Sequence, residues 1–299
     1  MTQTEKYVWL IDTILKANRI SLKEISDRWR DYAGLDDDEE LHRSRFNRWK
    51  DDILIQFGII IACRRKGGYK YYIENPEVIE ENRLLGWMLD TLATGNVLHD
   101  NIDLNNRILV NKIPSGNRHL KDVITAMKIN HKLEITHRRF GYASASTFVI
   151  DPYCIKLFEN RWYVLGKNNF GSVRIYGLDR IEDLRLTNEK FSLPVDFDAE
   201  SFFAPYFGVT VGQGKESQII VLRAYKEHKY YMSSLPIHES QELIEDAGEY
   251  ADFRLYLAPT SDLIMKLLSF GNMIEVLKPE TLRQEMMGYI SDMNQMYNR

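Results

Sequence analysis

The stretch from Ser44 to Ile73, SRFNRWKDDILIQFGIIIACRRKGGYKYYI, joins a helical pattern to a hairpin pattern. In its first half, apolar residues recur at the spacing of one helix face: Phe46, Trp49, Ile53 and Phe57. Ser44 is predicted to cap this helix and Gly58 to end it. Gly67 and Gly68 separate two β-rich runs, as in a hairpin turn. The stretch therefore predicts a helix followed by a β-hairpin.

Two further helices are predicted before this stretch. Residues 5–18 carry apolar side chains at helical spacing, and Ser21 and Glu24 form a capping box that opens a second short helix. The acidic segment Asp36–Glu40 is predicted to be a solvated loop before the third helix. Three short helices followed by a hairpin with a basic tip are the layout of a winged helix-turn-helix.

The charges of this region favour DNA binding. Residues 42–70 hold eight basic residues against Asp51 and Asp52. A helix in the major groove needs polar and cationic side chains, and a wing needs cations to meet phosphate. The predicted DNA contacts are Arg43, Arg45, Asn47, Arg48 and Lys50 on the helix and Arg64, Arg65 and Lys66 at the hairpin tip. The alternative is a winged helix that contacts a protein and leaves its basic face solvated.

The middle of the chain changes from helical to β-rich patterns. Residues 76–98 predict a connector helix, which either packs within its own domain or packs on a second copy of the chain. A helix at 120–131 precedes five β-rich runs: 132–140, 146–158, 161–167, 173–178 and 182–190. One helix followed by five short strands is typical of a small Sm-like or SH3-like barrel.

One string within these runs carries a family resemblance. Arg161-Trp162-Tyr163-Val164-Leu165-Gly166 resembles the motif that names the WYL domain, with Val164 inserted before the leucine. Three flanking strings occur in the order of that family: Ile135-Thr136-His137-Arg138-Arg139, Asp151-Pro152-Tyr153, and Val173-Arg174 through Asp179-Arg180-Ile181. The ordered set identifies the chain as similar to WYL-domain transcriptional regulators, which join a winged helix, a WYL barrel and a C-terminal extension.

The resemblance implies a barrel that senses a nucleotide or nucleic-acid ligand. Matched by position, the implied ligand-binding residues are His137, Arg138, Trp162, Tyr163, Arg174, Tyr176 and Arg180. His137 stands where many members have a tyrosine.

Strand alternation supports part of this set. Arg174 and Tyr176 share one strand face, which places a cation beside an aromatic ring, as oligonucleotide binding requires. Trp162 and Tyr163 are adjacent and point to opposite faces, so one of them belongs to the core, and the pattern leaves open which one. The alternative is that both are barrel core.

The last third of the chain predicts a ferredoxin-like domain. After an extended connector at 192–214, the patterns follow the order β-α-β-β-α-β and end in a helix from Glu280. The expected strands are 217–224, 238–244, 250–258 and 273–277, and the helices between them are 226–234 and 260–270. This part resembles the C-terminal extension of WYL proteins, which implies a role in dimerisation. The methionines of the last helix are expected in its core: Met286, Met287, Met293 and Met296.

Composition excludes several classes of protein. The chain has 299 residues, 44% of them hydrophobic, and only two cysteines, Cys63 and Cys154, so neither wholesale disorder nor a disulfide framework is expected. It has no apolar run of about 18 residues and no signal-peptide pattern, so we expect a cytoplasmic protein without a membrane partner. The net charge of −4 hides an uneven distribution, because residues 118–190 hold 13 basic and 8 acidic residues while 191–299 hold 9 and 16.

Catalytic signatures are absent from the sequence. It contains no HExxH, P-loop, GxGxxG or GxSxG motif, and an isolated strand cysteine such as Cys154 is usually a buried small hydrophobe. We therefore expect no enzyme, no cofactor and no metal site.

The sequence thus predicts an α+β multidomain protein. Its expected domains are a winged helix-turn-helix (1–75), a helical linker (76–117), a WYL barrel (118–191), a connector (192–214) and a ferredoxin-like domain (215–299). The leading hypothesis is a homodimeric transcription regulator that binds operator DNA and senses a nucleotide or single-stranded nucleic acid. One alternative is an RNA- or single-strand-binding accessory protein whose winged helix contacts a protein. Another is a purely structural dimeric module, which would bind no nucleic acid.

Overall fold

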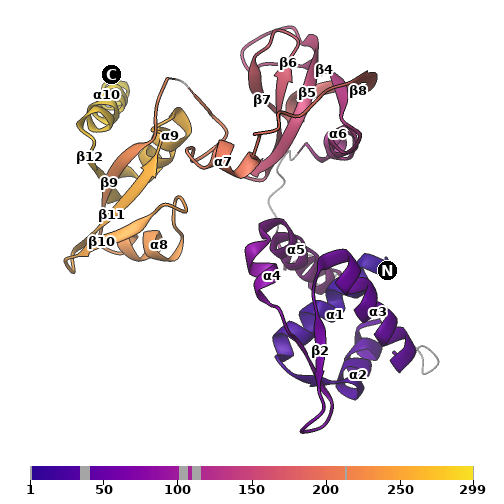
Figure 1. Cartoon of the computed structure of the whole chain (residues 1–299). Coiled ribbons are helices and arrows are strands. Elements are labelled where there is room, and N and C mark those ends of the chain that lie inside the picture. Colours follow the sequence, from indigo (N-terminus) through magenta and orange to yellow (C-terminus); the bar gives the residue numbers. More distant parts are fainter. Residues whose placement is uncertain (1, 34–40, 101–106, 110–115, 213, 299) are drawn as a thin grey trace. The chain divides into compact units, whose positions relative to one another are not determined.

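The computed structural model describes residues 2–33, 41–100, 107–109, 116–212 and 214–298. Within them, helices combine with three antiparallel sheets in an α+β multidomain chain (Figure 1). The chain divides into two compact units, residues 1–111 and 112–299, and each is described by itself. The predicted loop Asp36–Glu40 lies outside the described residues.

The first unit has three helices before a β-hairpin. They are α1 (Gln3–Ala17), α2 (Leu22–Ala33) and α3 (Arg43–Phe57), followed by β2 (Ile61–Arg64) and β3 (Lys70–Ile73). A two-residue strand, β1 (Ile20–Ser21), pairs with β3 and completes a sheet of order β1-β3-β2. The sequence did not reveal β1, because two residues are too few to show an alternating pattern.

The helix ends follow local hydrogen bonding. The predicted capping box is present, since the Ser21 amide donates to Glu24 Oε2 at 2.8 Å and the Glu24 amide donates to Ser21 Oγ at 3.3 Å. Gly58 ends α3 in the left-handed region, with φ of 68°. The prediction of Ser44 as N-cap is wrong, because the N-cap of α3 is His42, two residues earlier, and it forms no side-chain cap.

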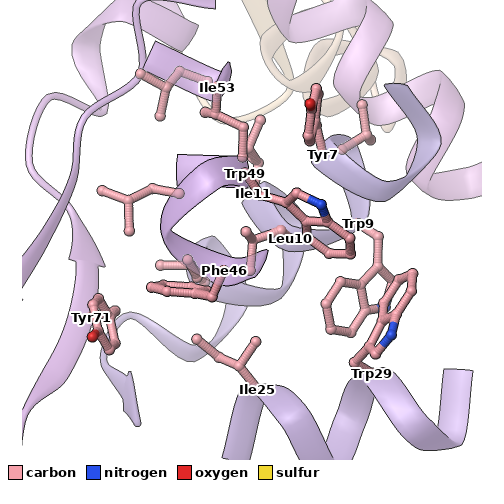
Figure 2. Close-up of a cluster of buried hydrophobic side chains, with 14 of the residues drawn as sticks. Tyr7, Trp9, Leu10, Ile11, Ile25, Trp29, Phe46, Trp49, Ile53 and Tyr71 are labelled. Atoms are coloured by element: carbon pink, nitrogen blue, oxygen red, sulfur yellow. The ribbon is translucent and has the colours of Figure 1, made fainter. Parts of the chain in front are cut away.

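Aromatic packing holds the three helices together. Trp29 lies edge-on to Trp9, with ring centroids 4.9 Å apart, and to Trp49 at 5.0 Å. Figure 2 shows these rings beside Phe46, which with Trp49 and Ile53 turns the apolar face of α3 into the core. The opposite face of α3 is thereby left toward solvent.

The predicted connector helix is two helices, α4 (Glu77–Glu81) and α5 (Arg83–Asp100). Asn82 breaks them apart, and its Oδ1 accepts a hydrogen bond from the Leu85 amide at 3.0 Å as an N-cap does. Leu85 and Leu89 are buried in the core of the first unit. Of the two alternatives for this segment, packing within its own domain is therefore present, while Leu84 on the outer side is 63% exposed.

The second unit begins with a helix over a five-stranded sheet. Its elements are α6 (Asn117–Ile129), β4 (His131–His137), β5 (Ser146–Phe158), β6 (Arg161–Asn168), β7 (Val173–Gly177), η3 (Leu178–Arg180) and β8 (Ile181–Lys190). The strands pair antiparallel in the order β7-β6-β5-β4-β8, and α6 covers the sheet with Val123 and Ala126 fully buried (Figure 1).

The start of α6 lies against η3. Gly116, with φ of 77°, precedes the helix, and a Cβ built there would lie 2.6 Å from Leu178 Cβ and 2.7 Å from the Asp179 amide nitrogen. One turn further, His119 Nε2 lies 3.1 Å from the carbonyl oxygen of Ile181. Both contacts tie α6 to the segment between β7 and β8.

A second sheet follows the short helix α7 (Ala199–Phe203). Its elements are β9 (Gln218–Tyr225), α8 (His228–Ser234), β10 (Glu242–Asp246), β11 (Tyr250–Leu257), α9 (Ser261–Ser269), η4 (Gly271–Met273), β12 (Ile274–Lys278) and α10 (Glu280–Tyr297). The strand order is β10-β11-β9-β12, all pairs antiparallel. The predicted strand 238–244 begins only at Glu242, because Gln241 is held in a turn by the Ile237 amide.

The last helix departs from its predicted packing. Leu282 and Met286 are buried, but Met287, Met293 and Met296 are exposed. The expectation of a methionine core along the whole helix is therefore wrong, because only its first two turns lie against the sheet. No helix among the described residues is long and apolar enough to cross a membrane.

Replacing Leu89 with alanine should destabilise the first unit by about 2–5 kcal/mol, the usual loss for a buried leucine. Urea unfolding followed by tryptophan fluorescence reports on this unit, which holds Trp9, Trp29, Trp49 and Trp87. Leu84→Ala on the same helix removes an exposed side chain and should cost less than about 1 kcal/mol. Equal losses in both variants would contradict the placement of α5 in the core.

Candidate nucleic-acid interfaces

The outer face of α3 carries cations. Arg43, Asn47 and Arg48 are exposed, and Arg45 and Lys50 are half-buried beside them. Asp52, one of the two acids in this stretch, accepts a hydrogen bond from the Tyr7 hydroxyl at 2.5 Å and so faces α1. The carboxylate of Asp52 is therefore engaged within the fold instead of neutralising the basic face.

The tip of the β2–β3 hairpin adds a second group of cations. Gly67 and Gly68 have φ of 95° and 107°, a region that favours glycine, and they allow the tight turn. The predicted residues Arg64, Arg65 and Lys66 are all exposed. Across residues 2–33, 41–100, 107–109, 116–212 and 214–298, none of the predicted cations of α3 and the hairpin forms an ion pair.

A groove of about 290 Å³ lies between these two elements and the start of α2. Its lining residues are Ser21, Leu22, Lys23, Arg43, Gly68, Tyr69 and Tyr71. Lys23 and Tyr69 were not among the predicted DNA contacts. Their positions in the sequence could have identified them, since Lys23 lies within the capping box at the start of α2 and Tyr69 directly follows the glycines of the hairpin turn.

A different cluster lies at one end of the five-stranded sheet, and we call it the barrel mouth: His137, Arg139, Phe140, Arg174, Tyr176 and Arg180. Leu133, Ile135 and His137 alternate toward the core along β4. The rings of His137 and Tyr176 meet edge to face with centroids 5.5 Å apart. Asn168 Nδ2 donates to the Tyr176 hydroxyl at 3.4 Å. The imidazole of His137 and the phenol of Tyr176 are therefore in direct contact, and we call this pair of rings the floor of the mouth.

Three arginines surround this floor. Arg180 and Arg139 act electrostatically on His137, and Arg174 and Arg139 act on Tyr176. The guanidinium of Arg180 lies over the Phe140 ring, 4.8 Å from its centroid. In the described part of the chain, Arg139, Arg174 and Arg180 form no ion pair. The mouth thus carries three cations that no described acid pairs with.

His137 is held neutral by this environment. Burial, and then the nearby charges of Arg180 and Arg139, lower the pKa of its imidazole to about 4, while Asp179 opposes the shift. The Nε2 atom is buried and has no hydrogen-bond partner in the described residues. A buried polar atom without a partner is costly, so this atom marks a place where a ligand would supply one.

Comparison with protein-family models identifies the two domains of the second unit. Residues 118–186 match the WYL domain, and residues 217–293 match the WCX domain. This chain carries a WYL domain followed by a WCX domain. The motif of residues 161–166 therefore lies in the WYL domain, as its resemblance implied.

Two solved structures resemble the chain over most of its length. The proteasome accessory factor B/C (PafBC) of Arthrobacter aurescens matches 95% of this chain and 45% of its own, at 18% identity and a TM-score of 0.37. A structure titled a CRISPR Cas-related protein matches 90% of this chain and 76% of its own, at 12% identity and a TM-score of 0.40. The chain thus spans less than half the length of the PafBC chain. No curated protein matches it.

The WYL domain gathers only part of the predicted ligand set. His137, Arg174, Tyr176 and Arg180 lie at the barrel mouth, whereas Arg138 points away from it. Arg138 Nε pairs with Glu182 Oε1 at 2.5 Å, and its Nη1 donates to the Ala143 carbonyl oxygen at 2.8 Å. Its charge is therefore already compensated on the outer face of β4.

The motif residues Trp162 and Tyr163 lie on opposite faces of β6. Trp162 packs against the WYL core on the side of Val164, while Tyr163 is half-buried on the other side. Burial raises the pKa of the Tyr163 hydroxyl, and the charges of Arg161, Asp179 and Arg180 act on it. The question left open by the sequence is settled, since Trp162 is the core residue of the pair.

Sequence reasoning missed Arg139, Phe140 and Asn168. Arg139 and Phe140 follow the last residue of β4, where period-two alternation no longer fixes direction. Asn168 ends β6, and its Oδ1 accepts hydrogen bonds from the Phe170 and Ser172 amides, a turn-forming role typical of asparagine. That turn holds Asn168 where it reaches Tyr176.

The environment of Cys154 disfavours the reactive thiolate form. It is buried on β5, and burial raises the pKa of its thiol to about 11. A nucleophilic cysteine needs a lowered pKa, so Cys154 fits a packing role. Among the described residues, no group of three His, Cys, Asp or Glu side chains could hold a metal ion.

The neutral His137 predicts a stability that falls in acid. Because the pKa of His137 in the folded protein is about 4, below the unfolded value of 6.5, the unfolded chain binds an additional proton between these values. His137 should therefore make the WYL domain about 2 kcal/mol less stable at about pH 5 than at about pH 7.5. His137→Gln should lose this component. Denaturant unfolding at both pH values measures it, and an unchanged pH dependence in the variant would refute the assignment.

Proposed function

We propose that this chain is a transcription regulator that binds operator DNA through α3 and the β2–β3 hairpin, and that its WYL domain binds a nucleotide or single-stranded oligonucleotide that modulates this binding. We interpret residues 1–75 as a winged helix-turn-helix, 118–191 as a small Sm-like or SH3-like barrel and 215–299 as a ferredoxin-like domain. The segments 76–117 and 192–214 join them.

The observation that carries the proposal is the positive charge on two distinct surfaces, whose cations form no ion pair within the part of the chain that the structure describes. On the first unit, the exposed side of α3 and the hairpin tip hold seven cations, among which Arg45 and Arg48 flank Asn47. Cations reach phosphate oxygens, and amide side chains read base edges in the major groove. The order of helices and hairpin supports docking of α3 in the groove with the hairpin on the backbone.

The barrel mouth supports the ligand part of the proposal. Nucleotides and single strands need cations for phosphate and rings for bases, and the mouth supplies Arg139, Arg174 and Arg180 beside Phe140 and Tyr176. The aromatic ring of Phe140 is 71% exposed, as a stacking platform must be. The WYL domain therefore has the chemistry of an anion-binding site with an aromatic rim.

We further propose that the protein acts as a homodimer in the cytoplasm. The exposed Leu84 on the outer side of α5 supports a second packing partner for this helix. A dimer would present two copies of α3 to a two-fold operator.

A second candidate function is an RNA- or single-strand-binding accessory protein. In that case the mouth binds nucleic acid, but α3 and the hairpin contact a protein. Duplex DNA at physiological salt separates the two functions, because only the regulator binds it. The same assay tests the purely structural module, which would bind no nucleic acid on either surface.

Changing Arg45 and Arg48 together to alanine should abolish specific duplex binding without unfolding the protein. The variant removes two phosphate or base contacts, so the slope of log K against log salt should fall in magnitude by about 2. Binding to the promoter region of the chain's own gene, titrated from low to physiological salt, measures both quantities.

The matched control is Arg185→Ala with Arg254→Ala, which removes the same charge from exposed residues of the second unit. It should bind DNA as the parent does. If the Arg45 and Arg48 variant also binds like the parent, α3 is not the reading helix.

Arg174→Ala should weaken binding of a single-stranded oligonucleotide by about 10-fold or more, as expected when one charge-assisted phosphate contact is lost. Fluorescence anisotropy of a labelled oligothymidylate gives the affinity. Arg185→Ala removes a cation of the same domain that is already paired with Asp183, and it should leave the affinity unchanged. Identical titrations for Arg174→Ala and the parent would refute a binding role for the mouth.

A further inference from the structure

Within the barrel mouth, the least explained atom is Nε2 of His137. The residue is 5% exposed, and Nε2 has no hydrogen-bond partner among the described residues. Two other histidines of the WYL domain have partners: Nε2 of the buried His119 lies 3.1 Å from the Ile181 carbonyl oxygen, and Nδ1 of the half-buried His131 lies 2.8 Å from that of Thr187. His137 differs from both, because its unsatisfied atom lies among cations.

The groups that face His137 come from several elements. Arg139 follows β4, Tyr176 lies on β7, and Arg180 and Asp179 lie on η3. Arg174, also on β7, acts on Tyr176. Asp179 pairs with Arg161 at 3.2 Å, so its negative charge is shared. Glu182 is engaged by Arg138 on the outer face. The field at the imidazole is therefore dominated by cations, and it opposes protonation while the mouth is empty.

A bound phosphodiester would change both the cationic field at His137 and the lack of a partner for its Nε2. Its negative charge would offset Arg139, Arg174 and Arg180, and its oxygen would give Nε2 the missing partner. A protonated imidazole carries hydrogen on both ring nitrogens, so Nε2 would necessarily donate to that oxygen. The same ligand that the arginines attract would thus favour the charged form of His137.

We propose that His137 takes up a proton from solvent when a phosphodiester enters the barrel mouth, and that its Nε2 then donates a hydrogen bond to the ligand, so that oligonucleotide binding strengthens as the pH falls. This inference rests on the proposed ligand binding by the WYL domain and adds a regulatory property to it.

The direction of the pH dependence follows from the linkage between ligand binding and proton uptake. The pKa of free His137 is about 4, and a bound phosphodiester raises it, so the complex holds more protons than the free protein between the two values. If binding raises the pKa of His137 to about 6 or 6.5, the affinity should increase about 4- to 10-fold from about pH 7.5 to 5.5. Above the pKa of the complex, the affinity should not change with pH.

The probe is an oligothymidylate of about eight residues with hydroxyl ends, a length within the usual range for single-strand sites. Phosphodiesters and thymine do not titrate between about pH 5 and 8, whereas a terminal phosphate monoester has a pKa near 6 and would mask the effect. Calorimetry of the full chain, at constant salt and in buffers of different ionisation enthalpy, gives the affinity and the number of protons taken up.

His137→Gln keeps an amide donor but does not titrate in this range, and it should abolish both the proton uptake and the pH dependence. His131→Gln, on the same strand, is the matched control and should retain both. Because a buried substitution can unfold the domain, the ring resonances of His137 in the parent provide a second measurement, and they should titrate at a higher pH with the oligothymidylate than without it.

The outcomes separate the two proposals. Binding that strengthens in acid, takes up protons and loses both properties in His137→Gln supports the inference. Binding with equal affinity at both pH values, or an equal increase in His137→Gln, overturns it and leaves ligand binding intact. No binding of the oligothymidylate at either pH overturns the proposed ligand binding itself.

Discussion

A β-strand sends successive side chains to opposite faces, and this constraint decides which residues of the WYL domain can meet a ligand. Along β4 it turns His137 inward, while Arg138, the residue after the strand, is exposed and pairs with Glu182. Along β6 it turns Trp162 inward and Tyr163 outward. Within a strand, the neighbour of a residue that faces the ligand therefore points to the opposite face of the sheet. The barrel mouth combines two inward residues, His137 and Tyr176, with cations and an exposed ring from the segments around them.

In the first unit, helix α3 also separates its side chains between a buried face and an exposed face. Phe46, Trp49 and Ile53 anchor one side of α3 in an aromatic core, and this anchoring leaves the basic side in water. Of the two acids on this helix, Asp52 accepts a hydrogen bond from Tyr7, and Asp51 is exposed. The buried apolar side of α3 and its cationic outer side are two results of one amphipathic pattern.

Much of the fold was predictable because its signals are local. The capping box at Ser21, the left-handed stop at Gly58 and the alternation of β4 each depend on neighbours along the chain. The failures have two causes. The break at Asn82 has a local cap, the hydrogen bond from the Leu85 amide to its Oδ1, which the continuous apolar pattern of 76–98 concealed, and the open side of α10 depends on how far the sheet extends beneath it. Of the candidate site, the strand residues were predictable, while Arg139 and Phe140 were not, because loops carry no periodicity.

The close approach of Gly116 to η3 gives position 116 a constraint of its own. A Cβ there would lie 2.6 Å from Leu178 Cβ and 2.7 Å from the Asp179 amide nitrogen, and η3 also carries Arg180. The absence of a side chain at this one position is therefore what allows the start of α6 to lie against the segment that presents an arginine to the mouth. Any larger residue at position 116 would push that segment and α6 apart.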